Sequence, residues 1–170
     1  NILKDGEVIA VVKAAANADF FFTTSDVTPG TATFGFWAED AGGLRSTAFN
    51  TTFEVLQSSV TTISGIFLPP TIEIDKRVVD PGEIITLSGQ SVPVVTVTTV
   101  VQSDPIETEV SSDDDGFWTH EFDTTDLEED AHTAKAKFVI PGTGNGAAAV
   151  ESGFSQALTF FVGEEGVLPS

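Results

Sequence analysis

Two dense groups of carboxylates are the first residues in this sequence that could do chemistry. The first group comprises Asp113, Asp114 and Asp115, and the second comprises Asp126, Glu128, Glu129 and Asp130. Calcium takes six to eight oxygen ligands, which acidic loops can supply, although neither spacing matches an EF-hand loop. Dense like charges repel and need salt, separation or a cation. Two interpretations stay open: calcium bound at either group, or a solvated acidic surface.

The two acidic groups cannot form a single site. They flank the apolar stretch Phe117–Phe122, which alternates as a strand does. Six residues at about 3.3 Å per residue would separate the groups by roughly 20 Å. The sequence therefore predicts two acidic poles at opposite ends of one strand.

The two histidines and one tryptophan fit a core better than an active site. His120 and Trp118 share the inward side of their strand with Phe122, and His132 shares an inward side with Ala134. No segment resembles a nucleophile elbow. We therefore expect a protein that is not an enzyme.

Trp37 is the candidate ligand-binding residue. Because Phe34, Phe36 and Ala38 take the inward positions of their strand, Trp37 should point outward. An outward tryptophan could stack on a sugar ring of a polysaccharide. The other interpretation is a covered surface residue, or one that contacts a neighbouring domain.

The composition limits the possible partners. The 170 residues carry 26 acidic and 7 basic side chains, for a net charge of −19. Nucleic acid and anionic lipid are bound by clustered lysine and arginine, so neither is an expected partner. No apolar run is long enough for a transmembrane helix, so we expect no direct membrane insertion. The absence of cysteine excludes disulfides and cysteine-based zinc sites.

Short alternating segments and turn residues predict an all-β fold. About seven such segments lie within residues 71–163, separated by turns such as Asp80-Pro81-Gly82 and Asp115-Gly116. Spacing of this kind is typical of a β-sandwich. We divide the protein into a partial unit (1–57), a semi-rigid apolar and proline-containing joint (58–70), a complete unit (71–163) and a tail or linker (164–170).

The same β unit occurs twice in the sequence. Residues 23–30 align with residues 123–130, and each follows an aromatic strand, Phe20–Phe22 or Phe117–Phe122. The second copy has a longer loop at 139–153. The first copy has no counterpart of residues 71–88, so one sheet should stay open. We expect the missing strands to come from outside residues 1–170, either from preceding sequence or from a neighbouring subunit.

Several motifs carry a family resemblance. Asp115-Gly116-Phe117-Trp118, Phe122-Asp123-Thr124-Thr125 and Val27-Thr28-Pro29-Gly30-Thr31 resemble the bacterial immunoglobulin-like (Big-type) repeat domains of large cell-surface proteins, as in uncultured small-genome bacteria. The resemblance covers nearly all of the sequence. It implies two tandem immunoglobulin-like β-sandwich domains, the first lacking its N-terminal strands.

The resemblance also implies an extracellular, cell-surface location and a class of function. The leading hypothesis is a non-catalytic structural segment, namely a spacer or a filament or stalk module. Its partners would be neighbouring domains or subunits of the same surface assembly. The alternative is an adhesive or carbohydrate-binding module that binds polysaccharide, with calcium as a cofactor. Fold alone does not decide between them.

Overall fold

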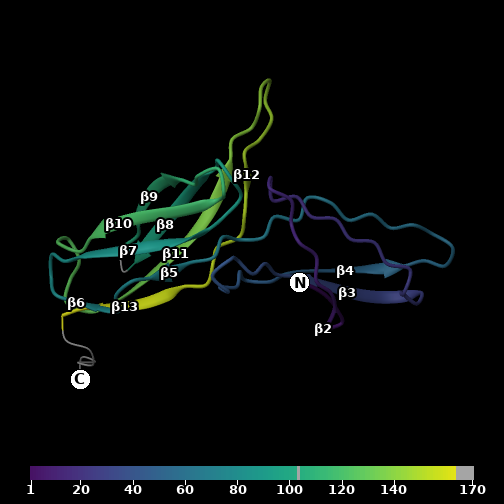
Figure 1. Ribbon diagram of the computed structural model, residues 1–170, viewed down its shortest axis with the longest axis horizontal. Helices are drawn as coiled ribbons and strands as arrows, with labels where there is room; N and C mark the ends of the chain where they lie inside the picture. The colour runs from purple at the N-terminus through teal and green to yellow at the C-terminus, as the bar shows by residue number, and fades with distance from the viewer. Residues whose placement is uncertain (103, 164–170) are drawn as a thin grey trace.

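The fold is built from β-strands. The structure is a computed structural model that describes residues 1–102 and 104–163. Those residues form 13 strands and no helix, so the all-β prediction is confirmed and no membrane-spanning helix occurs among them. Two hydrophobic cores lie end to end in an elongated molecule (Figure 1). The expected tail, residues 164–170, lies outside the described part.

One antiparallel sheet of four strands makes up the N-terminal unit, which we define as residues 1–57. Its strands are β1 (Ile2–Lys4), β2 (Glu7–Ala10), β3 (Gly30–Phe36) and β4 (Phe49–Val55). The order across the sheet is β2-β1-β3-β4. The turn at Asp5-Gly6 joins β1 to β2, and both residues have positive φ. In β3, Ala32, Phe34 and Phe36 are buried, because alternate positions of a strand share one face.

An extended segment rather than a second sheet lies over this core. Phe20 and Phe22 are half-buried against it, while Phe21 between them is 81% exposed. This alternation is that of a strand, but the segment pairs with no other strand in the described residues. The prediction of a strand at Phe20–Phe22 is therefore wrong, because the segment packs on the core face of the sheet and forms no ladder with its edge strands β2 and β4.

The joint, residues 58–70, runs from the end of β4 back along the N-terminal sheet to the C-terminal unit (Figure 1). Ile66 and Leu68 pack against the N-terminal core, whereas Phe67 packs against the C-terminal core. The ring of Phe67 meets Phe138 edge-on, with centroids 6.3 Å apart. The joint thus contacts both cores, although Val60 at its start is 94% exposed.

Two facing sheets make up the C-terminal unit, which we define as residues 71–163. Its strands are β5 (Glu73–Ile74), β6 (Val78–Val79), β7 (Ile84–Gln90), β8 (Thr96–Gln102), β9 (Ile106–Ser111), β10 (Phe117–Asp123), β11 (Ala131–Ile140), β12 (Val150–Glu151) and β13 (Leu158–Val162). One sheet has the order β10-β7-β5, and the other has the order β6-β13-β11-β8-β9, with β12 paired to β11. The pairing of β6 with β13 is parallel.

The core between these sheets follows the strand alternation expected from the sequence. Trp118 and Phe122 of β10 are buried, and Phe117 is 48% exposed. Phe138 and Phe160 are fully buried in the opposite sheet. The inward positions predicted for Trp118 and Phe122 are confirmed.

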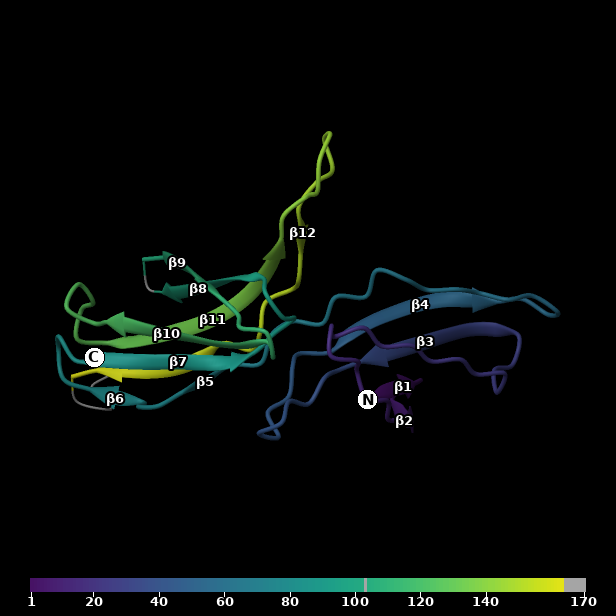
Figure 2. The ribbon, with the colours of Figure 1, turned by 45° about the horizontal axis from the view of Figure 1, so that its top comes forward.

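The loop after β3 connects the two units. Thr71 Oγ1 donates a hydrogen bond of 2.7 Å to Asp40 Oδ2, and Thr47 Oγ1 donates one of 2.9 Å to the carbonyl of Phe154. Figure 2 shows this loop reaching from β3 toward the C-terminal unit before it returns to β4. Both contacts are hydrogen bonds, and interfaces between domains of one chain are commonly polar.

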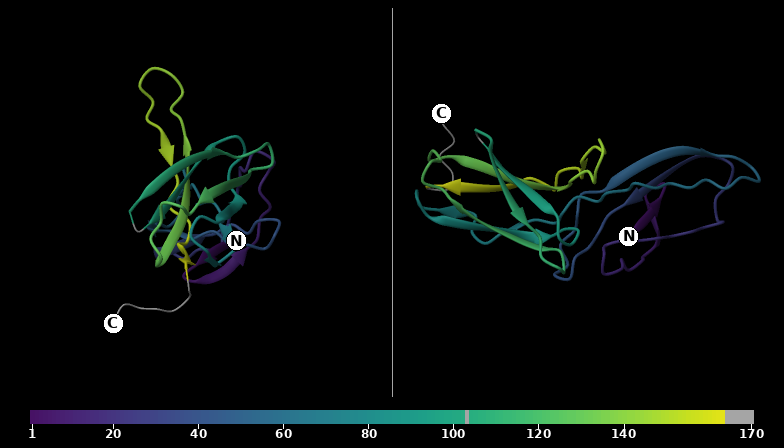
Figure 3. Two further views of the ribbon diagram at one scale, coloured as in Figure 1. Left: turned by 90° about the vertical axis from the view of Figure 1, so that its left-hand side faces the viewer. Right: turned by 90° about the horizontal axis from the view of Figure 1, so that it is seen from above.

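A hairpin projects from the C-terminal unit near the junction. It consists of residues 141–149, between β11 and β12, and stands clear of both units (Figure 3). All nine of these residues are exposed. We call this segment the projecting loop.

Candidate functional site

Asp113, in the first acidic group, uses its carboxylate to stabilise a turn. Asp113 Oδ1 accepts hydrogen bonds from the backbone N–H groups of Asp115 (2.9 Å) and Phe117 (2.8 Å). This arrangement closes the turn that leads into β10, a frequent use of aspartate in turns. Asp114 and Asp115 are exposed beside it.

The second acidic group lies at the other end of β10. Asp126, Glu128, Glu129 and Asp130 are all exposed in loop positions. Asp130 Oδ1 accepts a hydrogen bond from the Ala131 N–H (2.7 Å), while Glu128 contributes its carbonyl oxygen to a contact of 2.8 Å with His132 Nε2. Nearby, hydrogen bonds from Thr125 lower the pKa of Asp123.

The structure keeps the two acidic poles apart, as the strand length predicts. Within residues 1–102 and 104–163, no three aspartate, glutamate or histidine side chains are grouped as metal ligands would be. Calcium binding at either pole stays a hypothesis.

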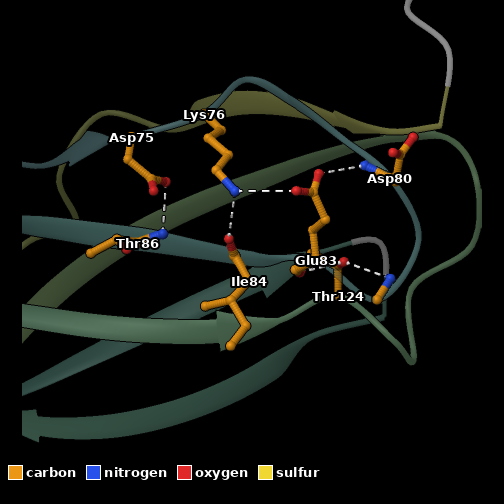
Figure 4. A network of polar contacts seen from close by, with 8 residues as sticks. Asp75, Lys76, Asp80, Glu83, Ile84, Thr86 and Thr124 are labelled. Carbon is orange, nitrogen blue, oxygen red and sulfur yellow. Dashed lines mark hydrogen bonds and ion pairs between the residues drawn. The ribbon is translucent and has the colours of Figure 1, made fainter.

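A polar network near the second pole has a structural role that the sequence analysis missed (Figure 4). Glu83 pairs with Lys76 at 3.3 Å and accepts a hydrogen bond of 2.9 Å from the Asp80 N–H. The Asp80 hydrogen bond, followed by Lys76, lowers the pKa of Glu83. Fully buried Thr124 donates to the Glu83 carbonyl (2.7 Å) and accepts from the Gly82 N–H (3.2 Å). This network joins the β6–β7 turn to the loop after β10, and the Asp80-Pro81-Gly82 turn was its only sequence signal.

Trp37 lies at the junction end of the N-terminal sheet and is half-buried. The guanidinium carbon of Arg45 lies 4.3 Å from its ring centroid, and Arg45 Nε is 3.5 Å from Glu39 Oε2. Arginine commonly stacks on tryptophan in this way. One ring face is thus already in contact with a cation, which leaves less of the ring for a sugar.

Both histidines serve packing. His132 is 1% exposed, and its ring lies 5.6 Å from that of Phe160. His120 is half-buried, with Nδ1 2.8 Å from Thr99 Oγ1, and desolvation by burial lowers its pKa. His132 contacts an aromatic ring and a backbone carbonyl, and His120 contacts a threonine hydroxyl. These surroundings are typical of packed histidines more than of a catalytic base.

The lowered pKa of His120 predicts a pH dependence of stability. An unfolded histidine titrates near pH 6.5, and the folded protein resists protonation until a lower pH. The favourable contribution of neutral His120 is therefore complete above about pH 6.5 and is lost as pH falls through the folded pKa. We expect His120→Gln to flatten the stability curve below about pH 6.5. Denaturant unfolding of both proteins across this range would measure it, and parallel curves would contradict it.

A hollow of about 530 Å³ lies between the two units. Asp40 and Leu44 contribute from the N-terminal side, and Glu73, Asp113 and Phe117 contribute from the C-terminal side. Sequence reasoning could not find it, because it depends on how the loop after β3 meets the sheet of β5, β7 and β10. Its lining holds the carboxylates of Asp40, Glu73 and Asp113 and no histidine or basic residue.

Comparison with known proteins did not identify a relative. The sequence and the structure were compared with protein-family models, curated proteins and solved structures, and none of the three comparisons gave a match.

Proposed function

We propose that residues 71–163 form an immunoglobulin-like sandwich. The order β5-β7-β10 corresponds to strands A, B and E of that fold, and β13-β11-β8-β9 corresponds to G, F, C and C′. The parallel β6–β13 pair brings the first part of the unit beside its last strand. One departure is that the core tryptophan, Trp118, lies on β10 instead of on the strand C equivalent, β8.

The N-terminal unit supports the same assignment for half a domain. With residues 23–30 aligned to 123–130, β3 corresponds to β11 and β4 to β13. The hairpin β1–β2 then corresponds to β8–β9, and Phe20–Phe22 to β10. In the N-terminal sheet Phe34 pairs with Lys4, and in the C-terminal unit Ala134 pairs with Val101. Lys4 therefore corresponds to Val101, and Asn1 corresponds to Thr98. No strand of the N-terminal unit corresponds to β5, β6 or β7.

The inward side chains of the N-terminal core are larger than their counterparts in the C-terminal core, and this difference predicts what the missing strands should carry. Where the C-terminal unit has Ala134 and Ala136, the N-terminal unit has Phe34 and Phe36. The small alanines share their core with Ile85 and Leu87 of β7. Because large and small side chains alternate across a packed core, strands that complete the N-terminal unit should carry small inward residues.

On this basis, the protein is a non-catalytic structural segment, a spacer or stalk module, of an extracellular bacterial surface protein. The observation that carries the proposal is the single sheet of the N-terminal unit, over which Phe20–Phe22 lies without a paired strand. The covering strands come from outside residues 1–170. Open sheet edges accept such strands readily.

A fusion protein tests this proposal. A copy of residues 71–97, with Ile85→Ala and Leu87→Ala in the copy, is joined directly before Asn1. We expect the added strands to cover the open face, so that the amides of β3 and β4 become more protected from hydrogen exchange and the N-terminal unit unfolds at higher denaturant. Exchange read by NMR would separate the two units.

The matched control is the same fusion with aspartate at both positions of the copy. Aspartate at inward positions would bury an unpaired charge, so this protein should gain no protection. Equal protection of β3 and β4 in the two fusions would contradict strand completion.

A further inference from the structure

The projecting loop differs from the rest of the protein in charge and in anchoring. Residues 138–150 contain no charged side chain, although the protein carries a net charge of −19. Strand pairing ends at Ile140 and Val150. Beyond that pair, the backbone hydrogen bond that closes the loop runs from the Ala147 N–H to the Gly144 carbonyl, at 3.1 Å. The tip is therefore held by one turn.

Asn145 and Gly146 are the two central residues of that turn. Both have positive φ, +32° for Asn145 and +84° for Gly146, the pattern for which Asn-Gly is favoured in tight hairpin turns. Apart from Gly146 itself and its two chain neighbours, no residue has an atom within 4 Å of the position that a Gly146 Cβ would take. The Gly146 amide has no backbone hydrogen-bond partner within the described residues. The amide nitrogen is thus open to solvent and free of steric cover.

We propose that Asn145–Gly146 is a site of spontaneous backbone modification. The Gly146 amide loses its proton to solvent base, and its nitrogen attacks Cγ of Asn145. A new C–N bond forms, the Cγ–Nδ2 bond of Asn145 breaks, and ammonia leaves, which gives a five-membered succinimide. Water then opens the ring at either carbonyl, leaving aspartate or isoaspartate. The balance is one water consumed and one ammonia released, with no oxidant or reductant.

The attack needs rotation about the Asn145 Cα–C bond, out of the turn geometry. Among the backbone hydrogen bonds of the described residues, only the one from Ala147 to Gly144 opposes that rotation. A loop that is held this weakly opens at a small cost in free energy. A glycine after the asparagine has no Cβ to obstruct the approach. The combination of an exposed loop, a weakly closed turn and a following glycine makes this position reactive.

The other internal asparagines lack this combination. Asn17 precedes Ala18, and its side group is held by hydrogen bonds with Asp19 at 2.6 and 3.2 Å. Asn50 precedes a β-branched threonine and lies within β4, opposite Gly35. These two residues serve as controls inside the same molecule.

The product changes a part of the protein that projects away from the C-terminal unit. An aspartate places the first negative charge on the neutral loop. An isoaspartate also adds a methylene group to the main chain, which the tight turn cannot hold unchanged. A partner that contacts this loop would therefore distinguish fresh from aged protein.

The test is an ageing experiment on the protein of residues 1–170 in warm, mildly alkaline buffer. Peptide mass spectrometry detects replacement of the asparagine amide by a carboxyl, and enzymatic methylation of isoaspartate identifies the rearranged product. We expect both signals at Asn145 before any at Asn17 or Asn50. Asn145→Gln should lose them, and Gly146→Ala should slow them many-fold.

Two results would overturn the proposal. One is modification of Asn17 or Asn50 as fast as of Asn145. The other is an intact Asn145 after a time in which a free peptide of residues 138–151 has reacted, because the folded turn would then protect the site.

Discussion

Replacing Trp118 with alanine should lower the free energy of unfolding of the C-terminal unit by about 3–5 kcal/mol. The indole is 2% exposed and belongs to the core formed with Phe122 and Phe138. Removing it deletes a large apolar surface and leaves a cavity that the two sheets cannot close. The indole Nε1 has no hydrogen-bond partner among residues 1–102 and 104–163, so the loss comes from packing. Denaturant unfolding followed by circular dichroism would measure it.

Phe117→Ala is the matched control for this prediction. Phe117 precedes Trp118 on the same strand but points outward and is 48% exposed. We expect its replacement to cost less than about 1 kcal/mol, as for most exposed positions. If the two variants lose similar stability, the inward and outward faces of β10 have been assigned incorrectly.

Replacing Gly89 with alanine should destabilise the same unit by about 1–3 kcal/mol through overpacking. A Cβ at this position would overlap the carbonyl oxygen of Thr71 and lie 3.0 Å from Trp118 Nε1. The first obstacle is backbone and cannot rotate away, so the segment before β5 must move from β7. Thr71 also holds Asp40 of the N-terminal unit, so the displacement should weaken the junction.

Gly153→Ala provides the comparison, because it makes the same chemical change with an ordinary contact. Its added Cβ would lie 3.5 Å from the ring of Pro69, and Gly153 does not have positive φ. Thermal unfolding of both variants should show a clear loss for Gly89→Ala and little change for Gly153→Ala. A harmless Gly89→Ala would mean that β5 and β7 are not packed as closely as described.

Much of the fold follows from local signals in the sequence. Alternation at Trp118 and Phe122 identifies the inward face of β10, and turns such as Asp80-Pro81-Gly82 separate the strands. The repeat between residues 23–30 and 123–130 predicts two units of unequal length. These features are readable because side groups alternate along a strand and because few residue types suit tight turns.

The remaining features depend on contacts between distant residues. Phe20–Phe22 has the alternation of a strand, yet it packs on the core face of the sheet and pairs with no strand of the described residues. Spacing alone likewise does not reveal that Arg45 stacks on Trp37. Nor does it reveal that Asp113 accepts a hydrogen bond from the backbone of Phe117 within its turn. Residue types identified the candidates, and tertiary contacts determined what each one touches.

Amide hydrogen exchange on the protein of residues 1–170 tests the central claim, that the N-terminal unit is open. We predict that amides of β8 and β11 in the C-terminal unit exchange only through global unfolding. Amides of β3 and β4 should exchange much faster, because one face of their sheet is covered only by segments that are not paired to another strand. Slow exchange of β3 and β4 in the monomer, with the same opening free energy as β8 and β11, would show a complete N-terminal unit and contradict the account.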